Sequence, residues 1–511
     1  MNSAKEESLQ LKITKDSIII NVASILSQLL VFLQTILVMR MLNPELYGIW
    51  IGLNILLSYG GFANLGLEYV FQIRYPYYQG KEDRDKCASI ADTVYSAWTL
   101  ATVVYVIGIL IYVLLFPQPS QIILWGLLAI AVLIVLEQQI AFQNRWITAG
   151  EKNFALSGYI SILRNAASFF IVVPLVYFFS VEGLMTGSVL VSAIVLLTWN
   201  IKTSFKFNWK PSFSTLKEMT LIGIPGFLIS TVNSFMKTAD RLLVVTLLGA
   251  VSLGYYGIVA MGGSFLYMIL AQAGGVMVPH MVEHMGKNND CAQSLEKYLI
   301  RPTLIFSYAS SIFLVICFFA IPLFVELLLP KYLPGLDAFY AFLPGFFPLS
   351  VMLAANNILY LVLIPRNQQR YIVYLQMAAA VIQIGLTVLF INLKWGIVGV
   401  ALAVTMASAF WGFSMLFLSV KYVLPENNKR LSFAAAVFKP FLYVLCCLSG
   451  VYLLQSQWHF SHPFILVLVK FILGLFIIAP LLYYMNKKTA IADLLAPLLT
   501  GIRRNLCCSH N

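Results

Sequence analysis

Charged residues are scarce in this sequence of 511 residues. Asp, Glu, Lys and Arg make up 11% of it and hydrophobic residues 60%, whereas a soluble domain carries about 25% charged residues. The composition therefore argues against a soluble protein. Apolar stretches of about 20 residues recur along the whole length, and the shorter alternating segments of a transmembrane barrel are missing. The sequence predicts an all-α polytopic membrane protein.

Several chemical signatures are also missing. No phosphate loop or convincing nucleotide fingerprint occurs, so we expect no ATP hydrolysis. The polar start lacks a small-residue cleavage site, which predicts no cleavable signal peptide. The seven cysteines show no disulfide framework and are expected to be free thiols. The net charge of +12 is scattered through short loops, which favours contact with membrane lipids and no nucleic acid.

The apolar runs divide the chain into about fourteen transmembrane helices. Their expected limits are 17–39, 46–70, 90–116, 121–143, 157–179, 182–201, 218–246, 250–278, 302–329, 339–364, 371–392, 395–420, 440–458 and 463–485. With the N-terminus inside, 26 of the 33 Lys and Arg residues fall in cytoplasmic segments, and external loops hold only Arg40, Lys331 and Lys394. This bias predicts a multi-pass protein of the cytoplasmic (inner) membrane with both termini in the cytoplasm.

An internal repeat predicts two lobes. A shift of 209 residues places the Tyr47-Gly-Ile triplet on the Tyr256-Gly-Ile triplet. We expect a MATE-like arrangement of two six-helix lobes plus two C-terminal helices. The expected divisions are 1–201 for the N-terminal lobe, 202–217 for a cytoplasmic linker, 218–425 for the C-terminal lobe, and 426–511 for the last two helices and a cytoplasmic tail.

The seventh span carries a polar stripe at helical spacing: Ser230, Asn233, Ser234, Lys237, Asp240 and Arg241. The repeat shift aligns Asn21 with Ser230 and Gln28 with Lys237. A charge at the centre of a spanning helix costs about 2.5–3.5 kcal/mol, which favours a wet cavity for the three charged residues and a Lys237–Asp240 salt bridge. For Asn21, Gln28 and Asn233, hydrogen bonding between packed helices is an equal alternative.

Glu137 and Arg164 lie on consecutive spans, each roughly 10 Å from the cytoplasmic face at 1.5 Å per residue. Their equal depth permits an ion pair. It could contact substrate, respond to protons, or be purely structural. Glu68 is a weaker candidate, because near a span end it is expected to reach towards the interface.

One stretch matches a metal motif. His280, Glu283 and His284 fit H-x-x-E-H, the inverted zinc-protease pattern. No convincing third ligand appears, so we expect no metal, no cofactor and no enzyme. An intramembrane zinc hydrolase stays a distant alternative.

A set of motifs distributed along nearly the whole chain resembles one known family. The motifs are Leu42-Asn-Pro-Glu-Leu-Tyr-Gly48, Asn64-Leu-Gly-Leu67, Asp240-Arg241 followed by Leu248-Gly249 and Leu253-Gly-Tyr255, Pro279, and Pro330-Lys-Tyr332. They resemble the polysaccharide-biosynthesis (O-antigen) flippases of the multidrug/oligosaccharidyl-lipid/polysaccharide exporter superfamily. The resemblance implies two lobes around a V-shaped cavity and carries over only to the Asp240-Arg241 position. It also implies a flippase for undecaprenyl-diphosphate-linked oligosaccharides, such as O-antigen, capsule or exopolysaccharide repeat units.

The sequence-based hypothesis is therefore a flippase for a polyprenyl-diphosphate-linked glycan, working by alternating access with H⁺ or Na⁺ as a possible coupling ion. The expected partners are this glycan and membrane lipids, with a polysaccharide polymerase and chain-length proteins as candidates, and we expect a monomer. An ion-coupled multidrug exporter is the alternative; four basic residues against two acidic ones within the spans favour an anionic substrate. The expected substrate-binding residues are Arg164, Lys237, Asp240, Arg241, Glu137, Asn233, Gln28 and Asn21.

Overall fold

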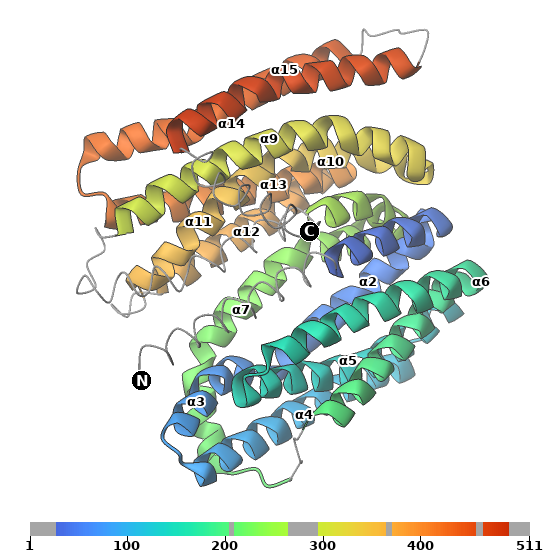
Figure 1. The fold of residues 1–511 in the computed structure, drawn as a ribbon. Helices are drawn as coiled ribbons and strands as arrows, with labels where there is room; N and C mark the ends of the chain where they lie inside the picture. Colours follow the sequence, from blue (N-terminus) through green and yellow to red (C-terminus); the bar gives the residue numbers. More distant parts are fainter. Residues whose placement is uncertain (1–26, 204–208, 264–294, 364–369, 456–462, 490–511) are drawn as a thin grey trace, which may run out of the picture. The chain divides into compact units, whose positions relative to one another are not determined.

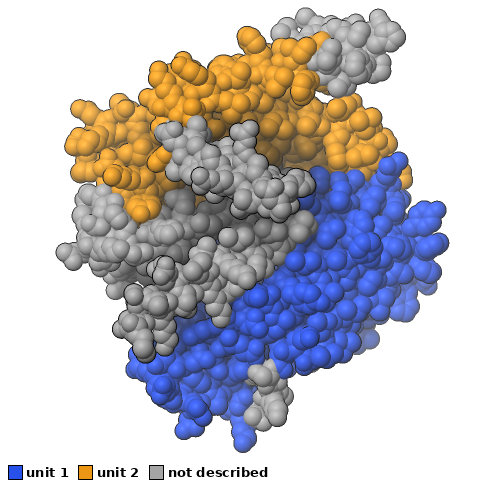
Figure 2. Space-filling view, viewed as in Figure 1, with its two compact units in different colours: residues 1–257 blue, residues 258–511 orange. Residues whose placement is uncertain are grey.

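The computed structural model describes residues 27–203, 209–263, 295–363, 370–455 and 463–489, and all the regular elements in these ranges are helices (Figure 1). The chain divides into two compact units, residues 1–257 and 258–511 (Figure 2). Each unit is described here by itself. The expected lobe division at residues 202–217 stays a prediction.

Unit 1 begins its described part with the apolar helix Ser27–Met41. Its further elements are α2 (Pro44–Gly60), the 3₁₀-helix η1 (Gly61–Asn64), α3 (Leu67–Gly80), α4 (Arg84–Leu115), α5 (Gln121–Arg145), the π-helix η2 (Trp146–Glu151), α6 (Phe154–Lys202) and α7 (Phe213–Leu247). A further helix starts at residue 249 and is described to residue 263. Side-chain hydrogen bonds cap the N-termini of several helices. Asn43, for example, directly precedes Pro44 at the start of α2, and its side chain accepts a hydrogen bond from the Leu46 amide.

The 49-residue helix α6 is two spans joined at a kink. Ser180 adopts φ 56° and ψ −134° inside it, a backbone conformation that breaks the helix. The kink falls between the predicted spans 157–179 and 182–201. Ten helices among the described residues are long and apolar enough to cross a membrane, with α6 counted once. A polytopic helical protein is thus confirmed, but the count of fourteen is not.

Two of the predicted spans contain a break in the α-helix. The span predicted over 46–70 ends as an α-helix at Gly60, and after η1 the chain turns through Leu65 (φ 49°) and Gly66 (φ 77°) before α3 begins. The span predicted over 339–364 is broken by η5 (Leu343–Gly345), which contains Pro344. Hydropathy predicts the apolar length of a span and not the backbone path within it, so these breaks were not part of the prediction.

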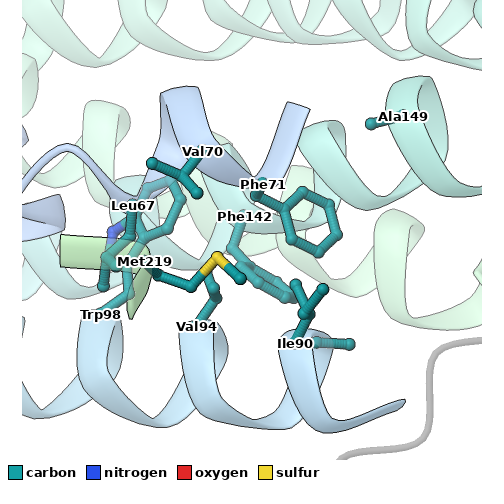
Figure 3. Packing of buried hydrophobic residues seen from close by; sticks show 10 residues of the cluster. Leu67, Val70, Phe71, Ile90, Val94, Trp98, Phe142, Ala149 and Met219 are labelled. Atoms are coloured by element: carbon teal, nitrogen blue, oxygen red, sulfur yellow. The ribbon is translucent and has the colours of Figure 1, made fainter. Parts of the chain in front are cut away.

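The core of unit 1 ties α7 to the helices before it. Its buried side chains come from α3, α4, α5, η2 and α7: Leu67, Val70, Phe71, Ile90, Ala91, Val94, Trp98, Phe142, Ala149 and Met219 (Figure 3). Trp98 donates a hydrogen bond to Gln138 of α5 at 2.7 Å, which satisfies two buried polar groups. The first turns of α7 therefore pack on α3 and α4, and this fixes where the charged end of α7 lies within unit 1.

Unit 2 contains α9 (Glu296–Leu328), η4 (Pro330–Gly335), α10 (Leu336–Phe342), η5, α11 (Phe346–Leu363), α12 (Arg370–Asn392), α13 (Gly396–Val423), α14 (Asn427–Gln455) and α15 (Pro463–Thr489). Helix α13 packs on α10, α11 and α12, while α9 packs on α11, α14 and α15. Phe347 and Phe441 stack with ring centroids 4.1 Å apart and join α11 to α14. The last two helices thus belong to the body of unit 2 (Figure 1).

Candidate functional site

Asp240 lies buried near the end of α7. Its side chain is 9% exposed, and its Oδ2 accepts a hydrogen bond from the Tyr256 hydroxyl at 2.8 Å. Gly249, with φ 84°, follows the end of α7 and lets the next helix turn back, so residues sixteen apart in sequence meet. Asp240 Oδ1 has no hydrogen-bond partner among the described residues. The turn therefore buries a carboxylate that is only partly satisfied.

The neighbouring cations differ from Asp240 in exposure. Lys237, one turn earlier, is exposed, and Arg241 is half-buried. The Nε atom of Arg241 is buried and has no hydrogen-bond partner among the described residues. The structure gives Asp240 the Tyr256 hydroxyl as a hydrogen-bond partner, and the Lys237–Asp240 salt bridge stays a prediction. Two cations against one carboxylate leave this end of α7 with excess positive charge.

The opposite face of α7 packs on α2. Thr238, which is buried, donates from its Oγ1 to the Tyr59 hydroxyl at 3.1 Å, and the ring of Tyr59 stacks with that of Phe235 at 6.5 Å. This packing leaves the side of α7 that carries Ser230 and Lys237 accessible. The amphipathic pattern of the seventh span is therefore reproduced within unit 1.

The predicted Glu137–Arg164 ion pair is confirmed. An Nη2 of Arg164 lies 2.6 Å from Glu137 Oε1, and the Ser192 hydroxyl donates to the same oxygen at 2.7 Å. Arg164 comes from the first half of α6 and Ser192 from the second, so the kink at Ser180 brings both to the carboxylate on α5. Glu137 is only 18% exposed. The positive charge of Arg164 balances the negative charge of Glu137 at a predicted depth where an isolated charge would be costly.

A second ion pair was missed by sequence reasoning. Arg145, at the end of α5, donates from Nε to Glu68 Oε1 at 2.6 Å and also places Nη2 on that oxygen. Glu68 Oε2 accepts from Asn64 at 2.9 Å. The sequence predicted that Glu68 reaches towards the interface, and it named no partner for the carboxylate. The available signal was that Arg145 and Glu68 both lie near the predicted cytoplasmic ends of their spans. Equal depth had already paired Glu137 with Arg164.

The remaining predicted residues are less informative. Asn233 on α7 and Gln28 on the helix Ser27–Met41 are half-buried, which fits either a cavity or helix packing. Asn21, His280, Glu283 and His284 lie outside the described residues. The structure thus brings predicted site residues into two polar groupings, Asp240–Tyr256 with Arg241, and Glu137–Arg164–Ser192. Among the described residues, neither grouping is joined to Asn233 or Gln28 by a hydrogen bond.

These features define a class: a multi-pass, all-helical membrane protein that keeps charged side chains within its spans. The sequence pattern of the polysaccharide biosynthesis protein family matches residues 37–332, and the chain belongs to this family. No curated protein matches the sequence.

Solved structures show the fold. The chain is similar to the lipid II flippase MurJ in an inward closed conformation, with a TM-score of 0.69, 16% identity, and coverage of 92% of this chain and 99% of that one. It is also similar to an inward-facing MATE family multidrug resistance transporter of the MOP superfamily, with a TM-score of 0.58, 14% identity, and coverage of 82% and 98%. The predicted MATE-like fold class is therefore confirmed.

Proposed function

We propose that this protein is a flippase that moves a polyprenyl-diphosphate-linked oligosaccharide, such as an O-antigen, capsule or exopolysaccharide repeat unit, across the inner membrane. The observation that carries the proposal is the excess positive charge of Lys237 and Arg241 on α7, the helix of the seventh predicted span. A diphosphate needs cationic hydrogen-bond donors when it leaves water. The family match and the fold shared with MurJ, which is named a lipid II flippase, support the same substrate class.

The two polar groupings suggest separate roles. Lys237 and Arg241 lie towards the outer face in the proposed topology, and Arg164 lies towards the inner one. The Glu137 carboxylate neutralises much of Arg164, so the inner grouping holds an anion less strongly than the outer one. We propose that the substrate meets Arg164 first and the α7 cations second during alternating access. Asn233, Gln28 and Asn21 would contact the sugars, and coupling to H⁺ or Na⁺, as in an antiporter, would drive the cycle.

The cellular setting follows from the same proposal. Both termini lie in the cytoplasm, the protein works as a monomer, and a polysaccharide polymerase and chain-length proteins act on the glycan after it crosses. No cofactor is needed, because moving a lipid-linked glycan breaks no covalent bond.

The test is surface polysaccharide production in a strain that depends on this protein. Lys237→Ala and Arg241→Ala should each abolish polysaccharide export while membrane insertion is retained. Lys210→Ala is the matched control, since it removes an exposed Lys outside the spans. Undiminished export in both α7 variants would refute the assignment of the site.

A multidrug exporter is the second candidate, because the fold is shared with a MATE transporter and Asp240 is a buried carboxylate suited to a cation. Drug resistance conferred on a pump-deficient host, lost in Asp240→Asn, would favour it over the flippase.

A further inference from the structure

Unit 2 contains a cavity of about 470 Å³ that none of the candidate site residues lines. It lies among α9, α10, α13 and α14, and its wall is mostly apolar. Asp337, Tyr340, Ser449 and Tyr452 are among the residues that line it. Its volume lies within the range of about 300–1,000 Å³ typical of small-molecule sites. An apolar chain would fit this interior.

One end of the cavity is polar and acidic. Tyr340 and Tyr452 pack edge to face there, with ring centroids 5.8 Å apart. The Asp337 carboxylate lines the cavity with Tyr340. The Glu326 carboxylate is not a lining group but lies within electrostatic reach of Tyr340, and both acidic side chains are exposed. Two carboxylates beside two tyrosines make a mouth that attracts an ammonium group and repels a phosphate-rich headgroup.

The position of the mouth relates it to a membrane leaflet. Asp337 follows η4, the connection between α9 and α10, which the distribution of Lys and Arg assigns to the outer face. Lys331 in η4 is exposed. A ligand here therefore meets the Asp337 carboxylate at headgroup level, and an apolar interior at the level of the acyl chains.

We propose that this cavity binds one aminophospholipid of the outer leaflet, with its primary ammonium at Asp337 and Glu326 and an acyl chain in the apolar interior. A primary ammonium donates hydrogen bonds to carboxylates, whereas a quaternary one cannot. The same acidic mouth disfavours the diphosphate of the proposed substrate, so the site is separate from the transport path and does not depend on it.

The experiment uses the full-length protein in nanodiscs that contain equal amounts of phosphatidylethanolamine, phosphatidylglycerol and phosphatidylcholine with identical chains. Native mass spectrometry then reports the lipid that remains bound. We expect one retained phosphatidylethanolamine per protein. Asp337→Asn should weaken this retention about three- to fivefold, the scale of an exposed ion pair. Glu82→Gln, which removes an exposed carboxylate in unit 1, should leave it unchanged.

A second pair of variants tests the apolar part. Ser449→Trp would fill the cavity from an exposed position on α14 and should abolish retention. Cys446→Trp places the same ring on an exposed position of α14 that does not line the cavity, and it should retain the lipid. Equal retention of the three lipids, or unchanged retention in Ser449→Trp, would overturn the proposal. So would displacement of the lipid by a polyprenyl phosphate or by tetraphenylphosphonium, which would identify a different occupant.

Discussion

The Tyr256 hydroxyl donates a hydrogen bond to Asp240 Oδ2 across the turn that ends α7. Tyr256 is fully buried and Asp240 is 9% exposed, so water cannot replace either partner easily. The bond holds the start of the helix after α7 against its last turns. It also fixes the carboxylate beside Arg241, which has no such partner for its Nε atom among the described residues.

Tyr256→Phe should lower the stability of the protein. The substitution keeps the ring but leaves a buried carboxylate oxygen unsatisfied, which costs about 1–3 kcal/mol. Thermal unfolding in detergent should show a lower midpoint. Tyr255→Phe is the matched control, because Tyr255 is half-buried and has no assigned part in this bond. Asp240→Asn combined with Tyr256→Phe should restore part of the loss, since an amide is less costly to bury than a carboxylate. Equal midpoints for Tyr256→Phe and the wild type would show that the bond does not stabilise the fold.

Arg164→Leu should destabilise the protein through the partner that it leaves behind. Glu137 would keep only Ser192 on Oε1. Breaking a fully buried pair costs about 3–5 kcal/mol, but the Arg164 and Glu137 side chains are 40% and 18% exposed, so we expect about 1–2 kcal/mol after solvent screening. A double-mutant cycle with Glu137→Gln measures the coupling. Additive losses in thermal unfolding would mean that the two side chains do not stabilise each other.

The contacts of Glu137 and Asp240 show how far the sequence can predict such a site. Glu137 and Arg164 could be paired in advance because consecutive spans are antiparallel and their depths are equal. The third member, Ser192, could not, because its approach depends on the kink at Ser180. Asp240 and Tyr256 were also out of reach, since their contact requires the turn at Gly249 and the rotation of both helices. Hydropathy gives depth along a span, whereas these contacts depend on rotation about the helix axis.

The internal repeat marks a physical contact as well as a repeated segment. Shifting the chain by 209 residues pairs Tyr47 with Tyr256 and Gly48 with Gly257. In the structure, a Cβ on Gly257 would lie 2.7 Å from the Tyr47 ring, and Tyr47 lies within electrostatic reach of Arg241. The repeated triplets thus meet where α2 crosses the helix that begins at residue 249. Sequence alignment of the two halves identified the positions but gave no reason to expect them to touch.

This crossing predicts a sharp difference between glycines. A Cβ on Gly254 would overlap the Pro44 carbonyl oxygen, so the backbones must separate to admit it. Gly254→Ala should therefore lower stability by about 1–3 kcal/mol, the usual cost of overpacking. Gly108→Ala is the control on α4, because a Cβ there meets nothing within 4 Å. It should be neutral or stabilising by up to about 1 kcal/mol, as alanine favours helix over glycine. Thermal unfolding of both variants decides the point, and equal midpoints would show that α2 and the following helix do not need this close approach.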